Sequence, residues 1–457
     1  MMRKRNILFT LAFFILVSVP ALLAGQNSGT DWKAGVARAK ITPGQNMWLA
    51  GYASRTHPAD GKLHDLWAKA LFLEDSAGNA GLLVTTDLLC FSKKVSDDIR
   101  ERLQKEMGLT KAQVILNSSH THTGPVLVEA LTNIYPIDAN EEEKIKEYSG
   151  WLVGQVVKLA KEARSSAEMS KIYTGNGVVR FQVNRRNNKE SEIKELTELK
   201  GPNDFAVPVL KVENKKGKTT AIVFGYACHP TVLSGYQWSG DYPGFAQLEL
   251  EQRYKGATAM FFQGAGADQN PLPRRSVALA RQYGQELAAA VERVLREKMK
   301  NQKAGLFTDY SEIDLEMNTP PSKEELVNLV SQLEGYKKTW AEKMLARVQE
   351  GIPLKTSYPY PVQFWQVGDQ RIVSLGGELL VNYSIQIKRL LGNETFVMGY
   401  SNDVMAYIPG EKVLKEGGYE VNSFYEYDLP STWKSGIEEA IIEEVIELEK
   451  HSGKEFF

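Results

Sequence analysis

Histidine and acidic residues follow apolar runs at distant points of this chain of 457 residues. His120 and His122 come after the apolar run 114–116, His229 ends a second apolar run, and Glu378 follows two glycines. A catalytic zinc ion takes a few nitrogen and oxygen ligands and keeps one coordination position open. The pattern therefore indicates a metal site, although hydrogen bonds to loop backbone would also explain His120 and His122.

The elements before these residues are typical of an α/β protein. Apolar and alternating runs predict strands at 32–41, 66–74, 81–86, 113–116, 171–174, 206–212, 220–227, 257–262, 363–367, 371–375 and 395–400. Several of these strands alternate with predicted helices, which favours the α/β class. Polar residues after such strands gather at the carboxyl edge of a sheet, where α/β proteins place their sites.

Helix signals complete this prediction. An acid-rich start and a lysine-rich end predict a helix over 140–163, because both complement the helix dipole. Ser322 and Glu325 form the capping-box pattern of a helix running to about residue 348. Further helices are predicted at 92–107, 244–254, up to about 295, after Glu378 and at 431–450. Since no repeat or linker interrupts the chain, we expect one large domain over residues 30–457.

The amino terminus has the features of an export signal. A basic start precedes an almost unbroken apolar run over residues 7–23, and small residues follow at Ala24 and Gly25. An uncleaved membrane anchor is the alternative, and the lack of a cysteine after this run argues against a lipoprotein. The sequence therefore predicts an exported protein (periplasmic, extracellular or at the cell surface), with residues 1–24 as its signal peptide.

Charge and cysteine content exclude some functions. Removal of residues 1–24 takes away three basic residues and no acidic one, which leaves a net charge of about −4. Such a chain has no basic surface for a phosphate backbone, so nucleic acid is not an expected partner. Cys90 and Cys228 would be able to form one disulfide in an exported protein, but their apolar surroundings favour buried thiols.

Several motifs together resemble the neutral ceramidase family. The most specific is the loop His-Thr-His-Thr-Gly-Pro at 120–125, and the others are Trp-Lys-Ala-Gly-Val-Ala-Arg-Ala-Lys-Ile-Thr-Pro at 32–43, Gly-Tyr at 51–52, Trp-Ala-Lys-Ala at 67–70 and Asn-Arg at 184–185. The resemblance spans nearly the whole chain after the signal. It implies a catalytic domain of mixed β-sheets with flanking helices.

The resemblance also implies a zinc site. The family's ligands correspond to His120, His229, Glu378 and Tyr407, and a second tyrosine follows Tyr407 by twelve residues, at Tyr419, as it does in the family. Such a metal activates a water molecule at neutral pH. A phenolic oxygen can form a hydrogen bond to the tetrahedral intermediate. We therefore predict that Tyr419 is a catalytic residue.

Three further residues gain roles from the same resemblance. His122, which is not one of the implied ligands, would donate a proton to a leaving group or an oxyanion. Arg185 matches the family's substrate-contacting arginine and would clamp a polar head group. Asp241 matches an acidic position after the second metal histidine, where it would either orient an imidazole or cap the helix that begins near Pro243.

The chain departs from the family at a glycine-rich turn. Ceramidases carry Gly-Asp-Val-Ser-Pro-Asn there, with a catalytic serine, whereas this chain reads Gly-Ala-Asp-Gln-Asn-Pro at 266–271. The serine chemistry does not carry over. Asp268, Gln269 or Asn270 would face the metal instead, and Asp268 is the candidate general base for the zinc-activated water.

A second departure is expected at the carboxyl end, where ceramidases carry an immunoglobulin-like domain that we do not expect in this protein. From the motifs together, we expect an exported zinc hydrolase that cleaves the amide of an N-acylsphingosine or a related N-acyl lipid, in peripheral contact with a membrane. The alternatives are a zinc hydrolase of another N-acyl compound, an ester or a glycoconjugate, and a non-catalytic surface binding protein. The sequence sets no oligomeric state.

Overall fold

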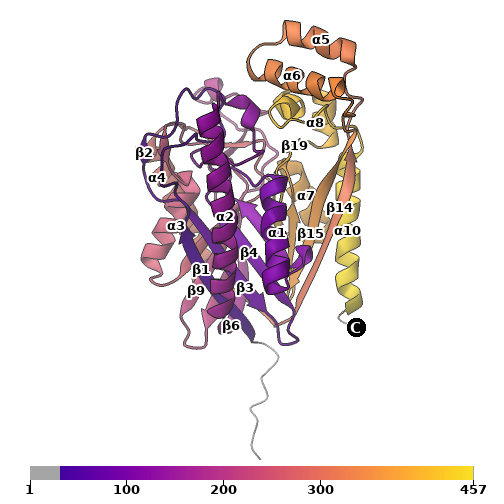
Figure 1. Cartoon of the computed structure of the whole chain (residues 1–457). Helices are drawn as coiled ribbons and strands as arrows, with labels where there is room; N and C mark the ends of the chain where they lie inside the picture. Colours follow the sequence, from indigo (N-terminus) through magenta and orange to yellow (C-terminus); the bar gives the residue numbers. More distant parts are fainter. Residues whose placement is uncertain (1–30, 456–457) are drawn as a thin grey trace, which may run out of the picture.

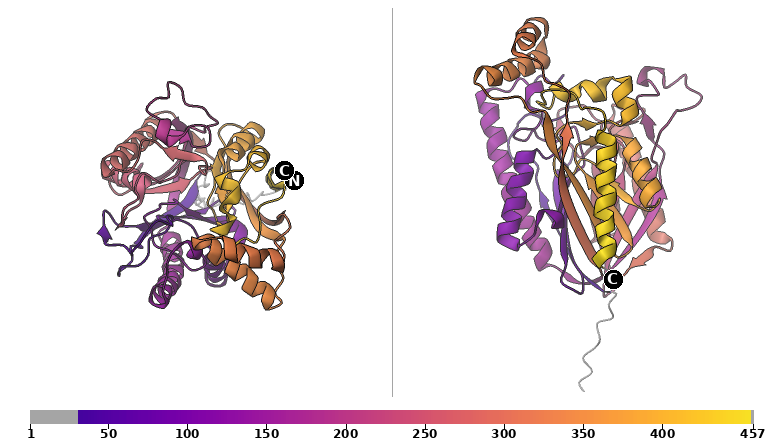
Figure 2. Two further views of the ribbon diagram at one scale, coloured as in Figure 1. Left: turned by 90° about the horizontal axis from the view of Figure 1, so that it is seen from above. Right: turned by 90° about the vertical axis from the view of Figure 1, so that its right-hand side faces the viewer.

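The computed structural model describes residues 31–455, so the predicted signal peptide lies outside the described residues. The fold contains three β layers around a common core, each covered on its outer side by helices (Figures 1 and 2). The predicted α/β class with mixed sheets and flanking helices is confirmed. Within the described residues, no helix is both long and apolar enough to cross a membrane.

The first two layers belong to one nine-stranded sheet that bends at a narrow seam. Strand β1 pairs with β6 only through Trp32–Ala34 and Glu168–Ser170. The first half contains β1 (Trp32–Lys40), β3 (Trp67–Glu74), β4 (Ala80–Thr86) and β5 (Val114–Ser118). The second half contains β6 (Glu168–Val178), β8 (Ala206–Asn214), β9 (Thr219–Tyr226), β11 (Thr258–Gln263) and β13 (Lys300–Gln302).

The third layer is a separate four-stranded sheet in the order β14-β15-β16-β18. It consists of β14 (Leu306–Glu316), β15 (Ser357–Val367), β16 (Gln370–Leu375) and β18 (Phe396–Met398). Strand β14 is absent from the sequence prediction because its burial pattern is irregular and its outer positions are polar. Trp32, Met260 and Trp365, one from each layer, meet in the shared core.

Helices cover the outer face of each layer. The first half is covered by α1 (Lys93–Met107) and α2 (Ala139–Ser165), the second by α3 (Asp241–Arg253) and α4 (Val277–Arg296), and the third by α7 (Val381–Leu391) and α10 (Ile437–Glu455). The view from above in Figure 2 shows these three sectors side by side. Loops at one end of the three layers therefore meet above the common core.

The remaining elements are short and lie mainly near this end. They are β2 (Gly61–Lys62), β7 (Gln182–Asn184), β10 (Gln237–Trp238), β12 (Gln269–Pro271), β17 (Glu378–Leu379), β19 (Tyr407–Ile408), α8 (Glu411–Glu416) and α9 (Tyr419–Asn422), with the 3-10 turns Lys111–Gln113, Thr132–Ile134, Glu190–Glu192 and Ser423–Tyr425. Both cysteines are buried free thiols.

One predicted helix proves to be two. The capping box of Ser322 and Glu325 is present and opens α5, which ends at Gln332. A second helix, α6 (Gly335–Gln349), begins after a break at Leu333 and Glu334, and its first residue, Gly335, has a φ of +57°. A left-handed residue cannot continue a right-handed helix, so the chain turns here and the two helices form a hairpin. The single helix predicted to about residue 348 is therefore wrong.

Candidate metal centre

Two imidazoles and one carboxylate converge where strands of different layers end. His120 follows β5, His229 follows β9, and Glu378 begins β17. Glu378 Oε2 lies 3.3 Å from His120 Nε2 and 3.1 Å from His229 Nε2, and all three side chains are buried. The structure therefore brings together His120, His229 and Glu378, as we expected from the sequence.

Backbone carbonyls fix the orientation of both rings. His120 Nδ1 lies 2.8 Å from Leu89 O, and His229 Nδ1 lies 2.8 Å from Gly266 O. Because a carbonyl only accepts, each Nδ1 carries the proton, and each Nε2 of a neutral ring presents a lone pair. Burial lowers the pKa of His229 to about 4, so that ring is neutral at pH 7.

This arrangement fits a metal ion. Two Nε2 lone pairs that face one carboxylate oxygen repel it unless a cation lies between them. Ligand atoms around a tetrahedral zinc lie about 3.3–3.5 Å apart, given metal–ligand bonds of about 2.0–2.2 Å. The separation of 3.3 Å falls within that range and that of 3.1 Å is 0.2 Å shorter than its lower end, while His120 Nε2 is buried without a hydrogen-bond partner among the described residues. The donor set therefore suits zinc.

His122 lies beside this group on the same loop. Ligand nitrogens of His120, His122 and His229 lie within 4.8 Å of one another, so the three histidines are able to share one metal ion. Neither nitrogen of His122 has a hydrogen-bond partner among the described residues, and its ring packs 4.7 Å from that of Tyr52. Burial, followed by the neighbouring histidines, lowers its pKa well below the usual range.

The loop that carries these histidines has an unusual backbone. His120 has a φ of +64°, a left-handed conformation that costs a non-glycine residue free energy. Its N–H donates to Leu88 O at 2.9 Å, and the hydroxyls of Thr121 and Thr123 both donate to Ser239 O. These bonds hold the strained residue in place and explain why threonines alternate with the histidines.

Tyr407 reaches the site through a short parallel bridge. Strands β17 and β19 pair Glu378 with Tyr407 and thereby bring together residues from separate segments. The Tyr407 ring stacks 6.4 Å from that of His229, and Tyr419 packs 5.3 Å from Tyr407. The guanidinium of Arg185 lies 5.4 Å from each tyrosine ring, so these predicted residues form one cluster.

A pocket of about 650 Å³ opens onto this cluster. Its wall includes His122, His229, Arg185, Asn270, Tyr407 and Tyr419. Its rim is charged, with Arg274 paired to Glu190 and Arg186 paired to Glu416. Two of the expected metal ligands, His229 and Tyr407, therefore line a pocket that a substrate can enter, together with His122.

Asp268 does not take the position expected of a general base. Its Oδ1 accepts the Val381 N–H at 3.0 Å, and its Oδ2 accepts the Asn184 side-chain amide at 3.0 Å. Asp268 is buried behind the pocket wall, and burial raises its pKa. Because both oxygens are engaged with the protein, the geometry does not support the predicted role, and Asp268 instead joins α7 to the loop of Arg185.

Asp241 also differs from both roles expected for it. Its Oδ2 accepts the Leu233 N–H at 2.8 Å and its Oδ1 accepts the Tyr242 N–H. It contacts no imidazole among the described residues, and it is the first residue of α3 instead of the cap, which is Gly240. Its role in the structure is to hold the turn that follows His229.

Sequence reasoning missed four residues that the structure brings to the site. Tyr427 Oη donates to Glu378 Oε1, and Tyr400 Oη lies 3.4 Å from Glu378 Oε2. Tyr52 packs on His122, and Arg55 Nη2 donates to the His122 carbonyl oxygen at 2.6 Å. Tyr52 stands in the Gly-Tyr motif of the resemblance, which was a usable signal, whereas the other three have no local pattern.

The comparisons with known proteins agree with this architecture. Residues 32–281, more than half of the chain, match the family model of neutral/alkaline non-lysosomal ceramidases, N-terminal. The chain therefore belongs to this family. Neutral ceramidase B of Dictyostelium discoideum is 27% identical over 221 residues, a match that covers 46% of this chain and 30% of that protein. The match thus spans less than a third of that relative's length.

Two solved structures share the fold. The neutral ceramidase from Pseudomonas aeruginosa matches with a TM-score of 0.71 and 18% identity, over 92% of this chain and 75% of that one. A structure described as ceramidase complexed with C2 matches with a TM-score of 0.69, with the same identity and coverage. At this identity the likeness establishes the fold, and the activity is argued below.

Proposed function

We propose that this chain is an exported, zinc-dependent hydrolase that cleaves the amide bond of a ceramide or a related N-acyl lipid. The observation that carries the proposal is the triangle of His120, His229 and Glu378, of which His229 lines an open pocket. Family membership supports the substrate class. The basic and apolar start of the sequence supports export.

The donor set assigns a place for the metal and roles for its neighbours. His120, His229 and Glu378 would hold it, with Tyr407 beside them. When bound, a zinc ion supplies Lewis acidity that polarises a carbonyl group and activates a water molecule. The fixed rings and the buried carboxylate position that charge without reorganisation during the reaction.

The chain's own side chains perform the remaining tasks. The ring nitrogens of His122 have no hydrogen-bond partner within residues 31–455 and His122 lines the pocket, so its ring can take a proton from the attacking water or give one to the leaving amine. Arg185 and Tyr419 also line the pocket, and Arg185 Nη2, which is buried without a hydrogen-bond partner in the described part of the chain, can donate to the substrate.

A second candidate is a zinc hydrolase of a different N-acyl compound, an ester or a glycoconjugate. The charged rim of the pocket favours this candidate. A plain ceramide would place hydrocarbon at an entrance that is surrounded by the charged residues Arg274, Glu190 and Arg186. The turn at 266–271 also lacks the serine that ceramidases carry there. The two candidates differ in substrate and share the same metal site.

The first test is the metal content and turnover of purified variants. We expect about one zinc per wild-type chain, loss of zinc in His120→Ala and His229→Ala, and retention in the exposed control His57→Ala. His122→Ala should keep the metal and lose at least about 100-fold in turnover, because it removes only proton transfer. Undiminished zinc in either ligand variant would contradict the site.

Turnover should be measured on a panel of ceramides, other N-acyl compounds, esters and glycoconjugates. Cleavage of ceramides above the rest supports the first candidate, and cleavage of another class supports the second. Metal binding without turnover of any substrate would instead identify a binding protein.

A further inference from the structure

Glu426 is a carboxylate beside the site that the proposed reaction does not use. It is half-buried and comes directly before Tyr427, the residue that donates to Glu378. Its Oε2 accepts a hydrogen bond from the Tyr419 hydroxyl at 3.0 Å, and its Oε1 accepts one from the Tyr336 hydroxyl at 3.4 Å. One carboxylate therefore joins a tyrosine of the pocket wall to a tyrosine of α6.

The hydroxyl of Tyr419 can serve only one acceptor at a time. Tyr419 lines the pocket, and its ring packs 5.3 Å from that of Tyr407. Burial raises the pKa of the Tyr419 phenol well above the usual range, so the hydroxyl keeps its proton at neutral pH. A phenol has a single O–H to donate. While Tyr419 donates it to Glu426, this proton is not available to an oxygen of a bound substrate.

The protonation state of Glu426 decides whether Tyr419 has to be the donor. An ionised carboxylate only accepts hydrogen bonds, so Tyr419 must donate between the two groups. A protonated carboxyl carries an O–H of its own and can donate to the phenolic oxygen instead. The O–H of Tyr419 is then free to turn into the pocket.

The surroundings of Glu426 let it change its charge near neutral pH. Burial, followed by the negative charge of Glu378, raises the pKa of Glu426 to about 7. Burial is the larger cause, and it does not depend on a metal ion at Glu378. The other titratable or charged groups that interact with Glu426 are the hydroxyls of Tyr419 and Tyr336, the guanidinium of Arg185 and the phenol of Tyr135. A surface glutamate, with a pKa of about 4.3, would stay ionised over the whole neutral range.

We propose that Glu426 is a positioning residue that holds the Tyr419 hydroxyl away from the substrate when it is ionised and releases this hydroxyl into the pocket when it is protonated. The released O–H would donate to the oxygen that gains negative charge at the scissile carbonyl. No bond between heavy atoms forms or breaks in this step, and Glu426 exchanges one proton with solvent. This inference rests on the hydrolysis proposed above and deepens the role of Tyr419 in it.

The pH profile of kcat/KM tests the inference on the best substrate of the panel. The wild-type rate should fall as pH rises through about 7, towards the level of Tyr419→Phe, which should be at least about 10-fold lower. In Glu426→Gln, the amide offers a donor and an acceptor at every pH, so this fall should disappear. Tyr419→Phe should lack the fall as well, because no hydroxyl remains to be held or released.

The matched control is Glu334→Gln, which removes an exposed carboxylate directly before α6. It should keep the wild-type profile, whereas a merely structural role of Glu426 would lower the rate of Glu426→Gln equally at every pH. Such an equal loss overturns the inference. So does a folded Glu426→Gln whose rate still falls through the same pH range.

Infrared difference spectroscopy separates this inference from the proposed reaction, because it needs no substrate. The wild-type spectrum minus that of Glu426→Gln should show a protonated carboxyl band that disappears as pH rises through about 7. In Tyr419→Phe, the band should persist to higher pH, because the lost hydroxyl no longer stabilises the ionised carboxylate.

If the wild-type protein cleaves no substrate, the hydrolase proposal fails and this titration still decides the link between Glu426 and Tyr419. A carboxyl band that is already lost near the ordinary glutamate pKa of about 4.3 overturns the inference. An equal midpoint in the wild-type protein and Tyr419→Phe overturns it too.

Discussion

The carboxylate of Glu378 accepts hydrogen bonds from phenolic hydroxyls and also faces two imidazoles. Tyr427 Oη donates to Oε1, and this leaves Oε2 directed at His120 and His229. A hydrogen bond to the distal oxygen of a ligating carboxylate orients that ligand and tunes its basicity. The metal affinity of the site therefore depends on a residue nearly fifty positions away in the sequence, which no motif marks.

Tyr427→Phe removes this hydroxyl without changing the ring. We expect metal affinity to fall by about 10–100-fold, the usual effect of losing a partner of a metal ligand. Competition with a chelator measures the change. Tyr425→Phe, whose ring packs on Trp340 away from the site, is the control. Equal affinities of Tyr427→Phe and the wild-type protein would show that Glu378 needs no support.

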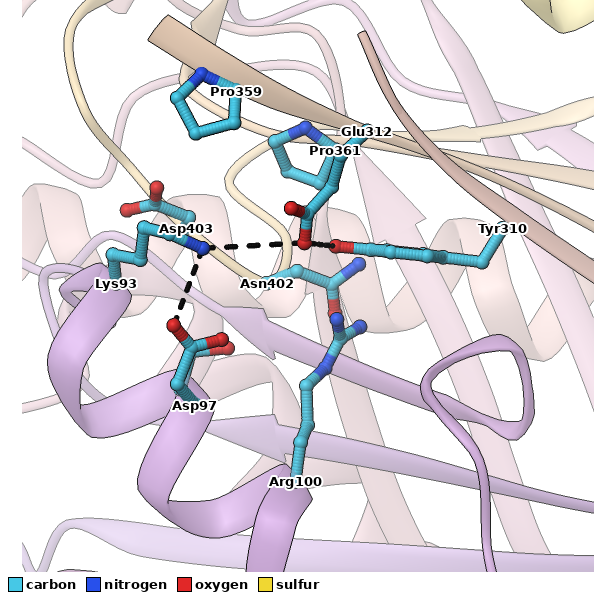
Figure 3. A pocket seen from close by; sticks show the side chains of 10 residues that line it. Lys93, Asp97, Arg100, Tyr310, Glu312, Pro359, Pro361, Asn402 and Asp403 are labelled. Carbon is cyan, nitrogen blue, oxygen red and sulfur yellow. Dashed lines mark hydrogen bonds and ion pairs between the residues drawn. The ribbon is translucent and has the colours of Figure 1, made fainter.

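The loop between β18 and β19 links the third layer to the metal site. Asp403 lies in it, and its carbonyl accepts the Gly377 N–H at 2.8 Å, directly before Glu378. Its carboxylate accepts a hydrogen bond from the Tyr358 hydroxyl at 2.7 Å. Asp403 also lines a small polar pocket together with Lys93, Asp97 and Glu312 (Figure 3). Burial raises the pKa of Asp403 to about 6.

A raised carboxyl pKa makes stability depend on pH. The unfolded chain titrates this group near pH 3.9, so between about pH 4 and pH 6 the folded state binds more protons. The free energy of unfolding should therefore fall as pH rises through this window, and Asp403→Asn should show a shallower fall. Urea unfolding at several pH values measures the slope. The exposed Asp369→Asn is the control, and an unchanged slope in Asp403→Asn would contradict the assignment.

At the scale of the molecule, the α5–α6 hairpin packs on the segment that carries Tyr427. Trp340 of α6 is 1% exposed, donates from Nε1 to Leu429 O at 2.8 Å, and packs edge-on against Phe424. Figure 1 shows the hairpin beyond the end of the sheets, beside α8. The hairpin has its own small apolar cluster, so it supports the site from outside the three layers.

Trp340→Ala should lower the free energy of unfolding by about 3–5 kcal/mol, since it leaves a cavity and an unpaired carbonyl. It should also weaken metal binding, because Tyr427 lies in the segment that Trp340 fixes. Urea unfolding and chelator competition measure the two effects. Trp151→Ala, which removes a tryptophan 42% exposed on α2, should change both little. If Trp340→Ala is destabilised but keeps its metal affinity, the hairpin does not support the metal site.

The sequence by itself predicted most of the strands and helices, and it pointed to three residues of types that commonly bind metals. Periodicity and capping are local, so α1, α2 and the strands before His120 and His229 were predicted within a few residues. The break at Gly335 and strand β14 were missed, because a glycine in a helical pattern and a polar-edged strand carry weak local signals. The position of a residue directly after an apolar strand is visible in the local sequence. This is why His120, His229 and Glu378 could be identified as candidate metal ligands.

Tertiary structure alone decided which polar atoms remain free. Asp268, Gln269 and Asn270 are equivalent candidates in the sequence, yet contacts with α7 and the loop before β8 engage the first two and leave Asn270 open to the pocket. Tyr427 likewise joins Glu378 only because the third layer and the hairpin bring their loops together. Hydrogen bonds between distant segments depend on the packing of whole layers, and that packing leaves no pattern in neighbouring residues.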